Sequence, residues 1–202
     1  MARQLNSPTT KEKIIQVVMN IIAQDGFQNI TIRKIAAQAG VNVAAVNYHF
    51  GSKDAVINEA LETVTNQLKN TFKYLRESNG SGETKLAIFI NNYTDILIKY
   101  PDIIKNMIYH QIYHRQIDEQ IGYVKFLRTE GIEIIKQTIG QIRPELDDKS
   151  LYLRTLHLLS CISFPILMGE QIEEIMGVDL HNREIRQMHA GTLLENACRR
   201  DG

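Results

Sequence analysis

The sequence predicts an all-α protein, and three observations carry this prediction. Apolar residues recur at spacings of three and four along most of the chain, which is the period of a helix with one buried face. Alternating patterns typical of strands are rare. The glycines and prolines fall at positions where such helices would end, break or kink. We therefore expect helices that pack on helices.

Helix starts are well marked in the first quarter of the chain. Thr9, followed three residues later by Glu12, forms a capping box and predicts a first helix that ends at Gly26. Polar residues suited to capping predict three further starts, at Thr31, Asn42 and Ser52. The helix that begins near Ser52 is expected to run long, up to the loop Asn79-Gly80-Ser81-Gly82.

The rest of the chain predicts further helices. They are expected at about 83–99, 101–114, 117–142, 151–176 and 183–199. The stretch from Leu156 to Met168 is apolar on nearly all sides, so more than one neighbour must cover it. Pro165 lies inside this stretch and removes the hydrogen bond to the carbonyl of Cys161, which predicts a kink.

Length and composition indicate a soluble protein of one domain or two small ones. The chain has 202 residues, of which 44% are hydrophobic and 23% are charged. No uninterrupted apolar run approaches the roughly 20 residues of a membrane span. The N-terminus lacks a signal-peptide pattern, and Cys161 and Cys198 have no close-spaced partner. We expect a cytoplasmic protein that does not enter a membrane.

Charge is unevenly distributed along the chain, although the formal net charge is zero. The segment that ends at Lys53 holds six basic and two acidic residues, which gives it a charge of +4 and leaves −4 on the remainder. A basic N-terminal end on an acidic body is typical of a protein that binds phosphate with one part only. Random scatter of charge is the alternative for a difference of this size.

The segment from Thr31 to Lys53 has the pattern of a helix-turn-helix. Two short helices that pack closely need small facing residues, and Ala36 and Ala39 meet this need. Gly40 between them can adopt the left-handed conformation that reverses the chain. Val46 is spaced to pack the pair against the first helix. The second helix of such a pair can enter the major groove of DNA.

This region resembles the tetracycline-repressor (TetR) family of bacterial regulators. The resemblance is dense from about Thr10 to Leu61. It rests on Ala-Gly-Val at 39–41 and on Tyr-His-Phe-Gly-Ser-Lys at 48–53. The remaining two-thirds resembles the family only in length, helical character and number of helices. The resemblance implies a three-helix DNA-binding domain, expected at 1–53, and a helical effector-binding and dimerisation domain at 54–202.

Side chains suited to phosphate oxygens lie at the end of the helix-turn-helix. Tyr48 offers a hydroxyl, His49 a ring nitrogen and Lys53 an ammonium group near a helix N-terminus. Packing of Tyr48 and His49 in the helical corner, or a merely solvated Lys53, are the alternatives. The resemblance implies phosphate contact at these positions and also at Thr31.

Base recognition is expected from a few side chains. The resemblance places Arg33, Val43, Ala44 and Asn47 at positions that face the bases. Arg33 can bind guanine through two hydrogen bonds, and Asn47 can pair with adenine. Val43 and Ala44 have no donors and can contact only thymine methyl groups. Many family members carry tyrosine where this chain has Asn47.

The resemblance also implies that the two last long helices form a homodimer. The all-round apolar stretch supports this independently, and one face of the final helix is suited to pair with it. The residues expected at the dimer interface are Leu156, Leu159, Ile185, Met188 and Leu193.

A small-molecule pocket is expected in the C-terminal domain. Its candidates combine apolar bulk with a few polar tips, as ligand sites do, although most such aromatics are ordinary core residues. They are Tyr93, Met107, His110, Tyr113, His114, Phe126, Phe164 and Met168. His110 and His114 are spaced to chelate a metal, but no third ligand is evident, so we expect no metal and no cofactor.

The resulting hypothesis is a repressor that is released from a pseudo-palindromic DNA operator by a small effector. Two alternatives remain open. One is a structural DNA-binding protein without an effector. The other is a small helical enzyme, for which the chain shows no pairing of nucleophile and base and no glycine-rich phosphate loop.

Overall fold

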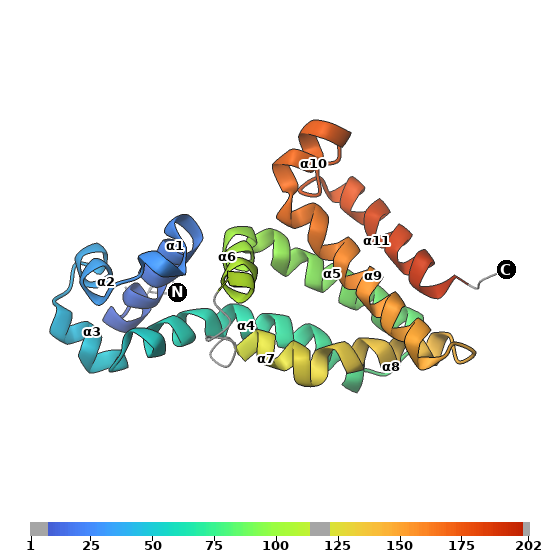
Figure 1. Cartoon of the computed structure of the whole chain (residues 1–202), viewed down its shortest axis with the longest axis horizontal. Coiled ribbons are helices and arrows are strands. Elements are labelled where there is room, and N and C mark those ends of the chain that lie inside the picture. Colours follow the sequence, from blue (N-terminus) through green and yellow to red (C-terminus); the bar gives the residue numbers. More distant parts are fainter. Residues whose placement is uncertain (1–7, 114–121, 200–202) are drawn as a thin grey trace, which may run out of the picture. The chain divides into compact units, whose positions relative to one another are not determined.

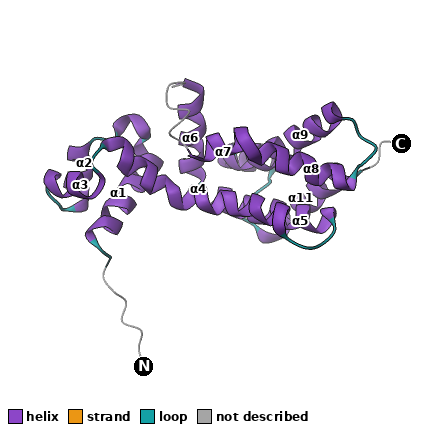
Figure 2. Cartoon of the chain, turned by 90° about the horizontal axis from the view of Figure 1, so that it is seen from below, coloured by secondary structure: helices purple, strands orange, loops and turns teal. Residues whose placement is uncertain are grey.

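The computed structural model describes residues 8–113 and 122–199, except for the side chains of 110–113. Every regular element within these ranges is a helix, which confirms the all-α prediction (Figure 2). The chain divides into two compact units. Unit 1 contains the chain up to Thr63 and residues 105–122, and unit 2 contains residues 64–104 and the chain from Tyr123. The division falls within two continuous helices, α4 (Lys53–Glu77) and α6 (Pro101–Tyr113).

Unit 1 begins with the helices that the capping residues predict. They are α1 (Thr10–Asp25), a 3-10 turn (Phe27–Asn29), α2 (Ile32–Ala39), α3 (Val43–Phe50) and the start of α4 (Figure 1). The Thr9 backbone N–H donates to a carboxylate oxygen of Glu12 at 2.7 Å, and the Glu12 N–H donates to the Thr9 hydroxyl. This completes the capping box, and the bond from Thr9 lowers the pKa of Glu12.

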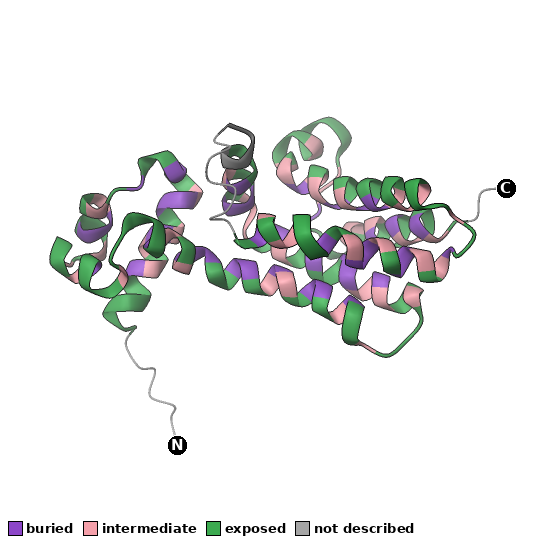
Figure 3. Cartoon of the chain, turned by 60° about the horizontal axis from the view of Figure 1, so that its bottom comes forward, coloured by how far each residue is buried: buried purple, intermediate pink, exposed green. Residues whose placement is uncertain are grey.

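Packing in unit 1 fixes the angle between α2 and α3. Gly40 ends α2 in the left-handed region at φ 67°, as predicted, and α2 packs against both α1 and α3. Ile35 and Ala36 of α2 and Val46 of α3 are buried together with the inner face of α1. Each of these helices therefore has one buried and one exposed face (Figure 3).

Unit 2 is a bundle formed around α5 (Gly82–Lys99). Its other elements are α7 (Gly122–Phe126), a π-helical turn (Leu127–Gly131), α8 (Ile132–Ile142), α9 (Asp148–Leu167), α10 (Gly169–Met176) and α11 (Arg183–Cys198). α5 packs against α8, α9 and α11, and α9 packs against α8, α10 and α11 (Figure 1). A loop precedes α5, as predicted, and the Ser81 hydroxyl caps its first turn.

Two predicted helices of unit 2 differ from the structure. The helix expected at 117–142 starts outside the described residues, and from Gly122 onward it contains a π-helical turn. The helix expected at 151–176 is divided at Met168, three residues after Pro165, into α9 and α10. Proline lacks a backbone N–H, so the regular hydrogen-bond pattern is interrupted before this break.

The carbonyl that Pro165 leaves without its helical donor has another partner. The His189 Nε2 atom of α11 lies 3.1 Å from the Cys161 oxygen of α9, at the distance of a hydrogen bond. Because a carbonyl only accepts, His189 donates through Nε2–H. The kink in α9 and its packing on α11 are thus joined by one hydrogen bond.

Aromatic rings form the centre of unit 2. The Phe72 ring makes edge contacts with Phe89, Tyr93 and Phe126 at centroid distances of 5.0, 5.8 and 5.2 Å. A Cβ atom at Gly131 would lie 3.1 Å from the Phe126 ring and 3.2 Å from the Phe72 ring. The π-helical turn therefore brings a residue without a side chain against these rings.

One helix in the described ranges, α9, is long and apolar enough to cross a membrane by length and composition. A single helix of this kind is weak evidence, because core helices of globular proteins meet the same criterion. Only 22% of its most apolar window is buried, however. One face of this apolar helix, with Leu153, Leu156 and Phe164, is therefore exposed in the protomer.

Substitution of Gly131 by alanine is expected to destabilise unit 2. The added methyl group would press on two rings that are already in contact, and overpacking of this kind costs about 1–3 kcal/mol. Denaturant unfolding followed by circular dichroism measures the change. Gly191→Ala is the matched control, since its new methyl group would meet no neighbouring atom within 4 Å. Equal stability of Gly131→Ala and wild type would contradict the packing described above.

The hydrogen bond between His189 and Cys161 is tested by a double-mutant cycle. His189→Ala is expected to cost about 1 kcal/mol of unfolding free energy, since the Cys161 carbonyl then loses its donor. In a Pro165→Ala background the residue 165 N–H supplies a donor, so the same substitution should cost close to nothing. The same cost for His189→Ala in both backgrounds would show that the two residues are not coupled.

Candidate functional site

The recognition helix α3 is positioned by one cap and one buried residue. The Asn42 side-chain oxygen accepts a hydrogen bond from the Ala45 N–H at 2.7 Å, and Val46 is fully buried. Because Val46 occupies the inner face, Val43, Ala44 and Asn47 all lie on the exposed surface of α3. The inward packing of Val46 thus leaves Val43, Ala44 and Asn47, the three α3 side chains expected to contact bases, exposed to solvent.

Arg33 lies exposed on α2, in the turn that Thr31 caps. The Thr31 hydroxyl oxygen accepts from the Lys34 N–H at 3.1 Å, which leaves its own O–H free to donate to an outside acceptor. The Lys34 ammonium is held by Asp25 at 2.8 Å. Arg33 forms no ion pair within the described part of the chain, so its guanidinium is available to a partner.

The predicted phosphate-binding end also faces solvent. Tyr48 is 87% exposed, and its ring meets the neighbouring His49 ring only at an edge. The Ser52 hydroxyl accepts from the Ala55 N–H at 3.1 Å and caps α4, as predicted. Lys53, the first residue of α4, therefore has its ammonium beside the positive end of a helix dipole. This combination favours an anion.

Ion pairs neutralise some of the basic side chains near the N-terminus and leave only a few of the described ones unpaired. Lys11 binds Glu59 and also lies over the Phe50 ring, and Lys34 binds Asp25. Of the six basic residues in the first 53, Arg3 lies outside the described residues. Lys13, Arg33 and Lys53 remain without an ion pair among those described. The sequence pattern does not distinguish these from the paired lysines.

The expected ligand-pocket residues that the structure describes differ in how far they are buried. Tyr93 and Met107 are buried and Phe126 is half-buried, whereas Phe164 and Met168 are exposed on α9 by 57% and 38%. The side chains of His110 and Tyr113, and the whole of His114, lie outside the described part of the chain. The described candidates therefore differ in burial, and their role in binding a ligand stays a prediction.

Tyr93 has a partner that sequence reasoning missed. Its hydroxyl oxygen lies 2.6 Å from the Tyr123 hydroxyl oxygen in a buried hydrogen bond. Burial raises the pKa of Tyr93 to about 12, and the hydrogen bond offsets part of this rise. Burial likewise raises the pKa of Tyr123 well above its usual value. Both hydroxyls are therefore neutral, and no residue spacing indicates that they meet.

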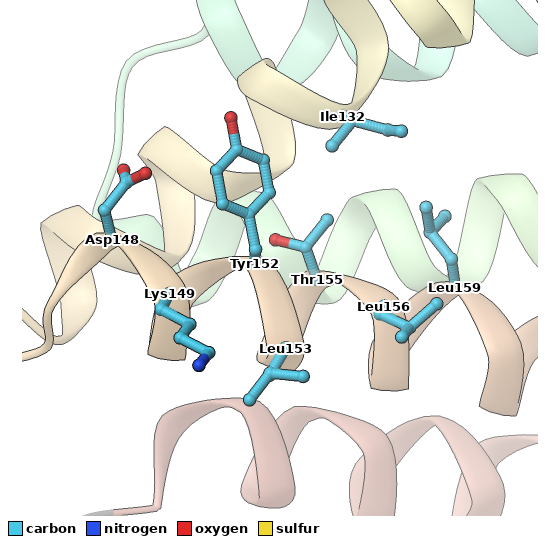
Figure 4. A pocket seen from close by; sticks show the side chains of 8 residues that line it. All are labelled: Ile132, Asp148, Lys149, Tyr152, Leu153, Thr155, Leu156 and Leu159. Carbon is cyan, nitrogen blue, oxygen red and sulfur yellow. The ribbon is translucent and has the colours of Figure 1, made fainter.

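Two surface hollows of unit 2 border α9, and none of the pocket candidates whose side chains the structure describes lines either of them. The first, here named the α8–α9 groove, has a volume of about 610 Å³. It is lined by Ile132, Asp148, Lys149, Tyr152, Leu153, Thr155, Leu156 and Leu159 (Figure 4). The second, of about 470 Å³, lies between α9 and α11 and includes Arg154, His157 and Cys161.

The expected dimer residues have mixed exposure. Leu156 and Met188 are exposed by 57% and 74%, and Leu159 and Ile185 are half-buried. Leu193 is only 5% exposed, because it belongs to the face of α11 that packs within the protomer. Leu193 is thus buried within the protomer, and its place in an interface between two copies stays a prediction.

The cap of α3 is expected to stabilise unit 1. Asn42→Ala removes the acceptor for the Ala45 N–H and should cost about 1 kcal/mol, as lost N-caps do. Asn42→Ser retains a capping oxygen and should behave like wild type. Thermal unfolding of both variants measures this difference, and equal losses for alanine and serine would refute the role of the cap.

Comparison with known proteins agrees with this geometry. Residues 14–60 match the model for bacterial regulatory proteins of the tetR family. The chain is 28% identical over 90 residues to the transcriptional regulator BetI of Stenotrophomonas maltophilia, covering 44% of this chain and 46% of BetI. It is 24% identical to the transcriptional repressor KstR2 of Mycolicibacterium smegmatis, covering 70% of this chain and 72% of KstR2. The match spans less than half the length of the first curated relatives.

Solved structures share the complete fold. The regulator FadR of Bacillus subtilis, solved in complex with stearoyl-CoA, superposes with a TM-score of 0.64 at 15% identity. The superposition covers 92% of this chain and 96% of FadR. This similarity extends the agreement from the N-terminal helices to the helical architecture of unit 2. Residues 14–60 thus match the tetR family of bacterial regulatory proteins, and the chain as a whole shares its helical fold with solved structures such as FadR.

Proposed function

We propose that the protein is a transcriptional repressor that binds operator DNA through α2, α3 and the start of α4. The observation that carries this proposal is the exposed surface on which Arg33 and Lys53 have no ion pair among the described residues and Tyr48 is 87% exposed. Side chains of this kind, exposed around a helix-turn-helix, are suited to phosphates and base edges. The family match to residues 14–60 supports the same conclusion.

The contacts divide into two groups by chemistry. Thr31, Tyr48, His49 and Lys53 bind backbone phosphates and fix the register on the duplex. Arg33 binds guanine and Asn47 binds adenine, while Val43 and Ala44 contact thymine methyl groups in the major groove. Val43 is 41% exposed, so its methyl groups are accessible to a base edge. Specificity then depends on few hydrogen bonds.

The repressor acts as a homodimer on a pseudo-palindromic operator in the cytoplasm. Exposed apolar side chains on α9 and α11, including Leu156 and Met188, support an interface between two copies. Two copies related by a two-fold axis present two recognition helices to two half-sites. The uncovered face of α9 is in this view an interface between protein subunits.

A small apolar effector releases the dimer from DNA. FadR was solved with stearoyl-CoA, which supports ligand binding by a domain of this fold. An effector that binds one conformation of unit 2 more tightly shifts the population toward it. Both α4 and α6 continue from unit 2 into unit 1, so a change in either helix reaches the DNA-binding unit through the covalent chain.

A second candidate function is a DNA-binding protein without an effector. Two observations favour it: the aromatic rings around Phe72 are packed against one another, and the Tyr93 and Tyr123 hydroxyls satisfy each other. An effector would have to separate these groups. Thermal unfolding in the presence of acyl-CoA and other apolar acids distinguishes the two, because a ligand that binds the folded state raises the melting temperature.

Two substitutions separate phosphate binding from base reading. Lys53→Ala is expected to weaken binding to all DNA sequences alike and to flatten the slope of log affinity against log salt by about 1. Arg33→Ala should reduce discrimination between the upstream operator and unrelated DNA by about 1–3 kcal/mol. Fluorescence anisotropy over a potassium chloride series measures both effects.

Lys125→Ala, an exposed lysine of α7, is the control for loss of a positive charge away from the interface. Unchanged affinity and salt slope are expected for this variant. If Lys53→Ala, Arg33→Ala and Lys125→Ala all lost saturable DNA binding equally, net charge alone, and not this surface, would account for the binding. Absence of any salt-sensitive, saturable binding by the wild type would refute the proposed function.

A further inference from the structure

A ridge of side chains at every fourth position runs along the uncovered face of α9. It consists of Tyr152, Leu156, Ser160, Phe164 and Met168, all exposed, and is named the α9 ridge. Tyr152 and Leu156 are 44% and 57% exposed on one side of Ser160, and Phe164 and Met168 are 57% and 38% exposed on the other. Large apolar side chains therefore flank a small residue symmetrically.

This symmetry matches the way two helices pack. Side chains four residues apart form ridges, and the commonest helix packing interlocks such ridges from both partners. In a two-fold dimer the same ridge meets itself, so the crossing point must lie at one residue of each copy. A small residue at that point lets the two backbones approach closely, and Ser160 is the small residue of the ridge.

We propose that two copies of α9 cross antiparallel at Ser160 and that Phe164 of each copy fills the α8–α9 groove of the other. This inference rests on the proposed homodimer and adds its register. Antiparallel crossing at Ser160 places position 164 of one copy beside position 156 of the other. Leu156 is a lining residue of that groove, so the Phe164 ring arrives at its edge.

The α8–α9 groove has the character of a site for an aromatic side chain. Ile132 of α8 and Leu156 and Leu159 of α9 supply an apolar lining, with the Tyr152 ring beside them (Figure 4). The Tyr152 ring itself lies 4.3 Å from the Lys136 ammonium, and Lys136 is held by Asp148 at 2.7 Å. Asp148 at this end of the groove is thus paired within the protomer, and the apolar part of the groove remains uncovered.

Charges at the two ends of the α9 ridge are complementary in the antiparallel arrangement. Lys149 lies at the N-terminal end of α9, and Glu170 and Glu174 follow its C-terminal end in α10. None of the three forms an ion pair within the described residues. An antiparallel crossing at Ser160 brings the Lys149 end of α9 in one copy toward the C-terminal end of α9 in the other, where α10 and its glutamates begin. A parallel arrangement would instead bring like charges together.

Disulfide trapping tests the register directly. In a full-length chain with Cys161→Ser and Cys198→Ser, we introduce Ser160→Cys, Leu156→Cys or Phe164→Cys separately. Ser160→Cys is expected to form a covalent dimer with itself on mild oxidation, because two-fold symmetry brings residue 160 next to its own copy. Leu156→Cys and Phe164→Cys should form few dimers alone, but should cross-link to each other when the two chains are mixed.

Light scattering on the uncross-linked proteins separates the register from the homodimer. A stable dimer in which Leu156→Cys links to itself, or in which Ser160→Cys does not, overturns the Ser160 crossing while the homodimer stands. A monomer at micromolar concentration overturns both. A monomer that sediments with phospholipid vesicles would show that lipid covers the α9 ridge, which also overturns the proposal.

Phe164→Ala gives an independent measurement without cysteines. Phe164 is 57% exposed in the protomer, so the variant should keep the helix content of wild type while its dimer dissociation constant rises at least tenfold. Tyr48→Ala removes an exposed aromatic from unit 1 and should leave dimer dissociation unchanged. Equal dissociation constants for Phe164→Ala and wild type would overturn the insertion of Phe164 into the groove.

Discussion

Each helix of this protein must bury an apolar face, and the arrangement of unit 2 follows from the way α9 meets this requirement. α5, α8, α10 and α11 pack on α9, yet one face of its apolar stretch stays exposed in the protomer. The side chains left over are large, such as Leu156 and Phe164. Exposed apolar surface of this extent is unfavourable in water, so it indicates a further partner.

Pro165 connects this requirement to the local geometry of α9. It interrupts the helical hydrogen bonds, and the helix ends three residues later at Met168. The interaction between His189 and the Cys161 carbonyl satisfies the backbone group that the proline leaves behind. The interruption of α9 by Pro165 thus leads to a hydrogen bond with α11. This bond holds together the two helices of the proposed dimer interface.

The short helices of unit 1 place buried and exposed residues on opposite faces. In α3, Val46 packs inward and Asn42 caps the first turn, whereas Val43, Ala44 and Asn47 face solvent. Ion pairs occupy Lys11 and Lys34, whereas Lys13, Arg33 and Lys53 have no ion pair among the described residues. A formal charge of +4 thus overstates the charge that is available to DNA.

The sequence by itself determined those features that depend on neighbouring residues. Helix starts at Thr9, Thr31, Asn42 and Ser52, the reversal at Gly40 and the kink after Pro165 follow from hydrogen bonds and backbone angles within a few positions. Residue spacing also predicted that Val46 of α3 packs inward, whereas the outward positions of Val43, Ala44 and Asn47 came from the family resemblance. Interactions between residues only a few positions apart can be predicted from the sequence alone.

Only the tertiary structure decided which aromatic side chains meet and which remain outside. The sequence names both Phe164 and Tyr93 as pocket candidates because both are aromatic. Phe164 is exposed, however, whereas Tyr93 is buried and its hydroxyl pairs with that of Tyr123, thirty residues away. Leu193 has the sequence character of an interface residue but packs inside the protomer. These outcomes depend on which helices become neighbours in space, and the period of one helix shows only that a face is apolar, not what covers it.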